Sequence, residues 1–123
     1  MSKLNFNIPK KTEPKIYGYI DLYDPSKKGY IKIGETARDP ETRINEQYPS
    51  AGSRMERPYK IVFCESSIRK DGSIFHDKQI HKLLDSNNFQ NLGREFWKCD
   101  LKDLEAAFNA VKNKESLDLE RNL

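Results

Sequence analysis

Two aromatic and β-branched stretches separated by a dense turn constrain the fold of this chain more than any other feature of its sequence. Residues 15–23 (KIYGYIDLY) have the composition of a β-strand, and so do residues 30–34 (YIKIG). The segment between them, DPSKKG, combines Asp, Pro, Ser and Gly as tight turns do. The sequence therefore predicts that the folded part of the chain opens with a β-hairpin.

The segment after the hairpin predicts a helix and then a strand. Asp39 is a good N-cap, and Pro40 suits the first position of a helix. This helix should end near Tyr48, because Pro49 disfavours a helical backbone in the residue before it. Residues 59–64 (YKIVFC) are the best strand candidate in the chain.

Two helices and a short strand are predicted in the second half of the chain. Ser73 is expected to cap a helix whose polar face carries Asp77 and His81. Residues 94–99 (REFWKC) predict a short strand, after which Asp100 caps a final helix. The expected apolar stripe of this helix consists of Leu101, Leu104, Ala107, Phe108 and Val111. The order β-β-α-β-α-β-α predicts an α/β (α+β) fold in which about three helices flank a small, mostly antiparallel sheet.

Length and composition limit the folded part to one small domain. The chain has 123 residues, of which 36% are apolar, and its net charge of +3 permits a phosphate-rich partner without requiring one. We expect a flexible leader at residues 1–13, a domain at 14–113, and a linker or tail at 114–123 that leads to a further domain of a longer protein. Because no apolar run approaches the ~20 residues that span a bilayer, we expect a cytoplasmic protein without a membrane partner.

Several short motifs occur in an order that resembles the GIY-YIG nuclease superfamily. In chain order they are KIG at residues 32–34, TARDPETR at residues 36–43, Asp77 four positions before His81, and REFW at residues 94–97. Together with the aromatic first strand they resemble the phage-type branch of the superfamily, the meiotically up-regulated-gene-like domain, in which KIG replaces YIG. The resemblance extends from about Ile16 to Val111.

The resemblance implies a metal-dependent DNA endonuclease that acts in phage defence, restriction or DNA processing. Its cofactor would be Mg²⁺ or Mn²⁺, its partner DNA, and a helicase or restriction module is expected in the same polypeptide. In-line attack on a phosphodiester needs an activated water, positive charge near the phosphate oxygens and a metal near the leaving oxygen. A phenol, basic side chains and a carboxylate are the residue types that serve these needs.

The resemblance assigns the tyrosine of the first motif to Tyr19 or Tyr17. These residues are two positions apart, so both side chains lie on one face of the strand and the sequence does not separate them. We favour Tyr19 because it gives the shorter hairpin. Lys32 takes the place of the second-motif tyrosine, as it does throughout the phage-type branch.

The resemblance places the remaining site residues on the first two predicted helices. Arg43 matches the helix arginine, whose guanidinium can form a fork onto phosphate oxygens. Asp77 matches the metal-binding carboxylate, where the family usually has the longer Glu, and His81 is a further catalytic candidate. A zinc site at His76, Asp77 and His81 is not expected, because the fourth ligand and the usual spacing are missing.

Basic residues outside this centre are candidates for contacts with DNA phosphates. They are Lys27, Lys28, Arg38, Arg54 and Arg57. Each candidate also has an ordinary explanation: the tyrosines can pack a strand face, and Arg43 can form a surface ion pair with Glu46 or Glu35. Two alternative functions therefore stay open, a non-catalytic nucleic-acid-binding or targeting module of a larger DNA-processing protein, and an interaction domain without nucleic acid.

Overall fold

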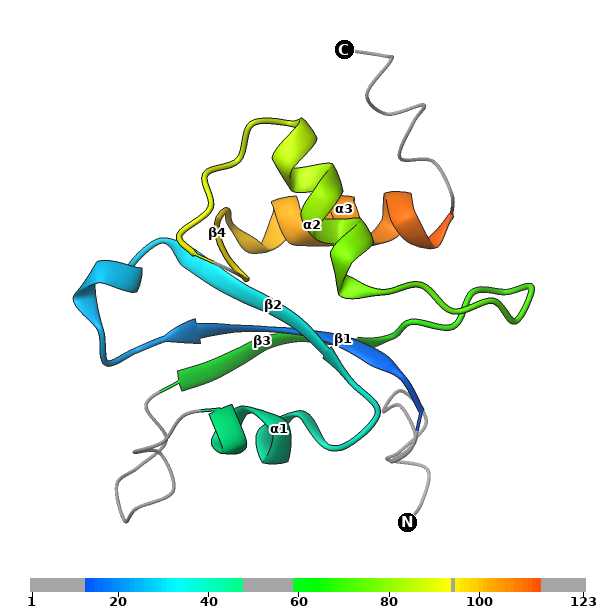
Figure 1. Cartoon of the computed structure of the whole chain (residues 1–123), viewed down its shortest axis with the longest axis horizontal. Helices are drawn as coiled ribbons and strands as arrows, with labels where there is room; N and C mark the ends of the chain where they lie inside the picture. Colours follow the sequence, from blue (N-terminus) through cyan, green and yellow to red (C-terminus); the bar gives the residue numbers. More distant parts are fainter. Residues whose placement is uncertain (1–12, 48–58, 94, 114–123) are drawn as a thin grey trace.

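A four-stranded antiparallel sheet organises the molecule, with the strand order β3-β1-β2-β4 (Figure 1). The computed structural model describes residues 13–47, 59–93 and 95–113. The elements are β1 (Lys15–Asp21), the 3₁₀ turn η2 (Pro25–Lys27), β2 (Tyr30–Thr36), α1 (Pro40–Gln47), β3 (Tyr59–Ser66), α2 (Asp77–Ser86), β4 (Phe96–Lys98) and α3 (Leu101–Lys112). The predicted fold class and the order β-β-α-β-α-β-α are confirmed.

The helices cover opposite faces of the sheet. In Figure 1, α1 lies below the sheet, whereas α2 and α3 lie above it. Side chains alternate along β1, so Ile16 points into the core beneath α2 and α3, while Tyr17 points into a smaller cluster with Ile44 of α1. The larger core contains Ile33, Phe75, Ile80, Leu84, Leu104 and Phe108. The smaller cluster is aromatic and contains Tyr17, Tyr19 and Tyr59.

Strand β1 is two residues shorter than predicted, because Asp21 ends it. A side-chain oxygen of Asp21 accepts hydrogen bonds from the backbone N–H groups of Tyr23 and Asp24 at 2.8 and 2.9 Å. This local turn withdraws Leu22 and Tyr23 from the sheet, and both are exposed. The predicted hairpin is confirmed, with Tyr17 opposite Gly34 and Tyr19 opposite Lys32.

Helix α2 begins later than predicted. Ser73 does not cap it, since its backbone N–H and hydroxyl both donate to Asp71 in a tight turn. The helix starts at Asp77, preceded by His76, whose backbone N–H donates to the side chain of Gln79 at 2.9 Å. The prediction that Asp77 lies on a polar face is also wrong, because this residue is only 6% exposed.

Helix α3 agrees with its predicted cap and, except at one end, with its apolar stripe. Asp100 and Asp103 exchange side-chain-to-backbone hydrogen bonds at 2.9 and 3.0 Å, which satisfies donors at the helix start. Leu104, Phe108 and Val111 are buried. Leu101 had been expected in the stripe but is 38% exposed, because it lies at the rim of a cavity.

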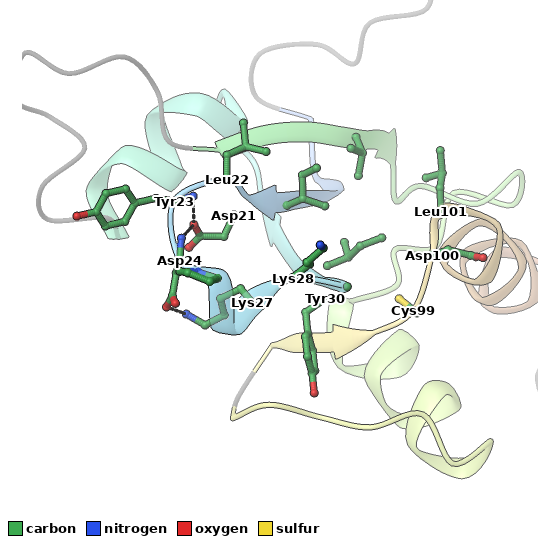
Figure 2. A pocket seen from close by; sticks show the side chains of 15 residues that line it. Asp21, Leu22, Tyr23, Asp24, Lys27, Lys28, Tyr30, Cys99, Asp100 and Leu101 are labelled. Atoms are coloured by element: carbon green, nitrogen blue, oxygen red, sulfur yellow. Dashed lines mark hydrogen bonds and ion pairs between the residues drawn. The ribbon is translucent and has the colours of Figure 1, made fainter.

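This cavity has a volume of about 530 Å³ and lies at the hairpin end of the sheet, on the α3 face (Figure 2). Ile20, Val62 and Leu101 contribute apolar walls, and Lys28 stands among the residues that line it.

No helix within the described ranges is long and apolar enough to cross a membrane. The predicted end of the first helix at Tyr48 lies outside the described residues, as do the leader up to residue 12 and the tail from residue 114.

Candidate active site

Tyr17 lies at the centre of the candidate site, on β1 directly opposite Gly34 of β2. Its side chain is buried, and a Cβ atom at position 34 would lie 2.6 Å from the phenol oxygen and 2.8 Å from the Cζ atom. Contacts below 3.0 Å are essentially never made by a Cβ atom, so only glycine lets the phenol lie against β2. The glycine of the KIG motif therefore admits the ring of Tyr17.

Lys32 comes from the same motif and lies over Tyr17. Its ammonium nitrogen is 2.8 Å from a carboxylate oxygen of Glu95 and donates a long hydrogen bond of 3.5 Å to the Tyr17 hydroxyl. The nitrogen also lies 5.6 and 5.7 Å from the ring centroids of Tyr17 and Tyr19. The lysine is largely buried, and such a charge needs a partner of opposite sign, which Glu95 supplies.

The electrostatics of Tyr17 show which charged groups surround it. Burial and the negative charge of Glu95 raise the pKa of Tyr17 to about 12, and Asp77 acts in the same direction. The charge of Arg43 on α1 and a hydrogen bond from it act to lower this pKa. Side chains from β1, β2, α1, α2 and the segment before β4 thus converge on one phenol, which stays protonated at neutral pH.

Asp77 occupies the first position of α2, beside a second carboxylate. Burial raises the pKa of Asp77, and the negative charge of Glu35 raises it further. An oxygen of Glu35 accepts a hydrogen bond from the backbone N–H of Asp77 at 3.0 Å and lies 3.2 Å from Nδ1 of His76. Glu35 therefore attaches the start of α2 to the end of β2 and fixes where Asp77 stands.

His81 attaches the same helix to β2 one turn later. Its Nε2 atom is 2.9 Å from the backbone oxygen of Ile33, and since a carbonyl only accepts, Nε2 carries the proton. Its ring also faces Trp97, with 5.7 Å between the ring centroids. These contacts give His81 a structural role, and its catalytic role stays a prediction.

Tyr19 belongs to the aromatic cluster next to this centre. It is 4% exposed and packs on Tyr17, Tyr59 and Phe96, with ring centroids 6.4, 5.4 and 6.1 Å away. Tyr17 is the residue whose hydroxyl meets both Lys32 and Arg43. Both tyrosines lie in the same buried cluster, so which of them is the motif tyrosine stays a prediction, with Tyr19 favoured from the sequence.

Residues 16–112 match the family model of the T5orf172 domain. The chain belongs to the T5orf172 domain family. This family is associated with phage proteins and with GIY-YIG-like nucleases, which makes the chain a nuclease-like or DNA-related domain. No curated protein and no solved structure matches the chain.

The basic residues of this T5orf172 domain that were expected to contact DNA differ in their surroundings. Arg38 forms a two-pronged pair with Glu46 at 2.9 and 2.7 Å, and Lys27 pairs with Asp24 at 3.2 Å. Lys27 and Lys28 both line the cavity at the hairpin end of the sheet. Arg54 and Arg57 lie outside the described residues.

Acidic side chains in and beside this centre carry oxygen atoms of the type that a hard divalent cation binds, but among the described residues they do not form a three-ligand metal site. Asp77, Glu35 and Glu95 offer oxygen ligands, the donor type that Mg²⁺ and Mn²⁺ prefer. Mg²⁺ commonly relies on one or two carboxylates and keeps several waters, so Asp77 would hold it mainly with water.

Two residues of this centre were missed by the sequence analysis as functional candidates. Glu95 belongs to the REFW motif, but nothing in the sequence shows that its carboxylate reaches Lys32 of a distant strand. Glu35 directly follows the KIG motif and had been considered only as an ion-pair partner of Arg43. Both act through contacts between residues far apart in the chain, which local patterns do not reveal.

Proposed function

We propose that this T5orf172 domain is a metal-dependent DNA endonuclease of the GIY-YIG type, from the branch with KIG in place of YIG. The observation that supports the proposal is the convergence of Lys32, Arg43 and Asp77 around the phenol of Tyr17. Two cations and a carboxylate beside a buried hydroxyl are the groups that phosphodiester hydrolysis requires. The nuclease would act in phage defence, restriction or DNA processing.

Each side chain has a role that follows from its position. Arg43 and Lys32 stabilise the charge that develops on the phosphate oxygens, Arg43 through its planar fork. Tyr17 is protonated at neutral pH, so it relays a proton between the attacking water and a neighbouring acceptor and does not start as a phenolate. Asp77 would hold Mg²⁺ or Mn²⁺, which supplies positive charge near the leaving oxygen when bound.

A second candidate function is a DNA-binding module without cleavage. The short carboxylate of Asp77 favours it, because this residue is 6% exposed and replaces the longer Glu that is usual in the family. A buried short side chain reaches less far toward a metal that must also retain several waters.

Metal-dependent nicking of supercoiled plasmid tests the two functions. We expect cleavage with Mg²⁺ or Mn²⁺ and none in EDTA. Arg43→Ala should lower the rate on the order of 10²-fold, since removal of one donor to a developing oxyanion has a cost of that size. Lys102→Ala removes an exposed charge on α3 and should leave the rate unchanged.

Arg43→Ala cleaving like the unmodified protein would refute the role given to Arg43. DNA that is bound in EDTA but cut with neither metal would reject the nuclease and select the binding module.

A further inference from the structure

A strip of aromatic and basic residues continues from Lys32 along the α1 face of strands β2 and β4. Lys32 lies opposite Tyr19 and therefore on the face of the aromatic cluster. Strand pairing places Phe96 opposite Lys32 and Lys98 opposite Tyr30, and opposite residues of an antiparallel pair share a face. We call Tyr30, Phe96, Lys98 and the adjoining Lys27 the β2–β4 strip.

The strip is accessible and positively charged. Lys98 is exposed, and it forms no ion pair with any acidic side chain in the described ranges. Tyr30 and Phe96 are half-buried. The ammonium nitrogen of Lys27 lies 4.6 Å from the ring centroid of Phe96, where it adds a second positive charge although Asp24 offsets part of it.

The spacing of the strip suits an extended polyanion. Residues on one face of a strand repeat about every 6.6 Å, so the Tyr30–Lys98 pair lies about that far along the sheet from the Lys32–Phe96 pair. Measured along the helix axis, this corresponds to about two base steps of one DNA strand, which rise ~3.4 Å each. Basic side chains contact phosphates, and tyrosine side chains contact both phosphates and sugars.

We propose that the β2–β4 strip binds the backbone of the DNA strand on one side of the phosphate held at Lys32. This inference rests on the proposed function, because the strip begins at the candidate site. It adds Lys98 and Tyr30 as contacts that the sequence analysis did not consider. It selects Lys27 over Lys28 because the Lys27 ammonium lies over the ring of Phe96, although both lysines and Tyr30 also line the cavity at the hairpin end of the sheet.

The test measures binding of a fluorescein-labelled DNA duplex of about 20 base pairs by anisotropy, in EDTA, over a series of salt concentrations. Each phosphate contact contributes about 0.9 to the slope of log K against log salt concentration. Lys98→Gln should therefore reduce the slope by about 0.9 and weaken binding about eightfold at 0.1 M salt. Lys102→Gln, the matched loss of one exposed charge on α3, should change neither.

Tyr30→Thr supplies a second, uncharged variant. Threonine suits a strand, so the fold is retained, whereas the ring that faces the sugar is lost. Binding should weaken several-fold with the salt slope unchanged, because no positive charge is removed. Thermal unfolding of every variant, followed by circular dichroism, shows that each one is folded at the temperature of the assay.

The outcomes separate this inference from the proposed nuclease activity. Equal salt slopes for Lys98→Gln and Lys102→Gln would overturn the proposal that the β2–β4 strip binds DNA, even if the protein cuts DNA. A protein that binds DNA with the expected loss in Lys98→Gln but cuts nothing in Mg²⁺ or Mn²⁺ would support the strip and reject the nuclease. Absence of any DNA binding by the unmodified protein would overturn both.

Discussion

The phenol oxygen of Tyr17 accepts hydrogen bonds from both Lys32 and Arg43. Tyr17→Phe removes this oxygen together with its bonds to Lys32 and Arg43. We expect cleavage to fall at least 10²-fold and the free energy of unfolding to fall by about 1 kcal/mol, the usual contribution of a hydrogen bond. Tyr19→Phe is the matched control and should retain most activity. Single-turnover cleavage rates distinguish the two, and the opposite ranking would identify Tyr19 as the motif tyrosine.

Asp77 should lower the stability of the folded protein at neutral pH. Its pKa is raised from the ordinary 3.8, chiefly by burial and then by Glu35, so the folded state favours the protonated form. The stability linked to this group is therefore fully present below about pH 3.8 and is lost as the pH rises through the raised pKa. Asp77→Asn, which stays uncharged, should unfold at a higher temperature than the unmodified protein at pH 7.

Melting temperatures measured at several pH values provide the control for this prediction. The difference in melting temperature between Asp77→Asn and the unmodified protein should shrink from pH 7 through pH 5.5 to pH 4. A difference that is constant over this range would mean that ionisation of Asp77 does not carry the effect.

Sequence reasoning located several site residues but not how they contact one another. Lys32, Arg43 and Asp77 were assigned from motif order, and the structure brings all three to Tyr17. The choice between Tyr17 and Tyr19 was not decidable, because residues two apart share a strand face. The two tyrosines differ in their neighbours, because the Tyr17 ring lies against Gly34 of the neighbouring strand. This contact exists only after the strands pair.

At the scale of secondary-structure elements, the contact between β1 and β2 depends on one missing methyl group. Gly34→Ala would place a Cβ atom 2.6 Å from the Tyr17 hydroxyl oxygen, and the packed ring has little room to move. We expect a loss of about 1–3 kcal/mol in the free energy of unfolding, as for overpacked cores, together with loss of cleavage. Urea denaturation measures the first effect.

A double-mutant cycle identifies the cause of this loss. Tyr17→Leu shortens the side chain opposite position 34, so combining it with Gly34→Ala should cost less than the sum of the two single changes. Additive losses would show that the clash with the ring is not the source.

The start of α2 shows why element boundaries escaped the sequence. Ser73 has the side chain of a good cap, yet it serves a local turn with Asp71. The helix begins at Asp77, where Glu35 of β2 accepts the backbone N–H across the fold. Capping preferences describe neighbours in sequence, so they predicted the cap of α3 by Asp100, which is local, and missed a cap supplied by another strand.

At the scale of the whole molecule, every described member of the two cores and of the candidate site lies within residues 13–113. Glu13 accepts hydrogen bonds from Ser66 and Lys15, and Asn113 closes the last turn of α3. We expect a chain of residues 13–113 to fold alone, with a melting temperature within about 4 °C of the full chain. Calorimetry of the two chains tests this, and a much larger drop would show that residues outside this range stabilise the fold.

The contact between His81 and Trp97 gives the molecule an intrinsic optical reporter. Trp97 is the single tryptophan of the chain, it is 5% exposed, and its indole faces the ring that joins α2 to β2. The tryptophan emission of the unlabelled protein therefore comes from one place, next to the helix that carries Asp77. A ligand that shifts α2 against the sheet will change the colour or intensity of that emission, whether or not any bond is cut.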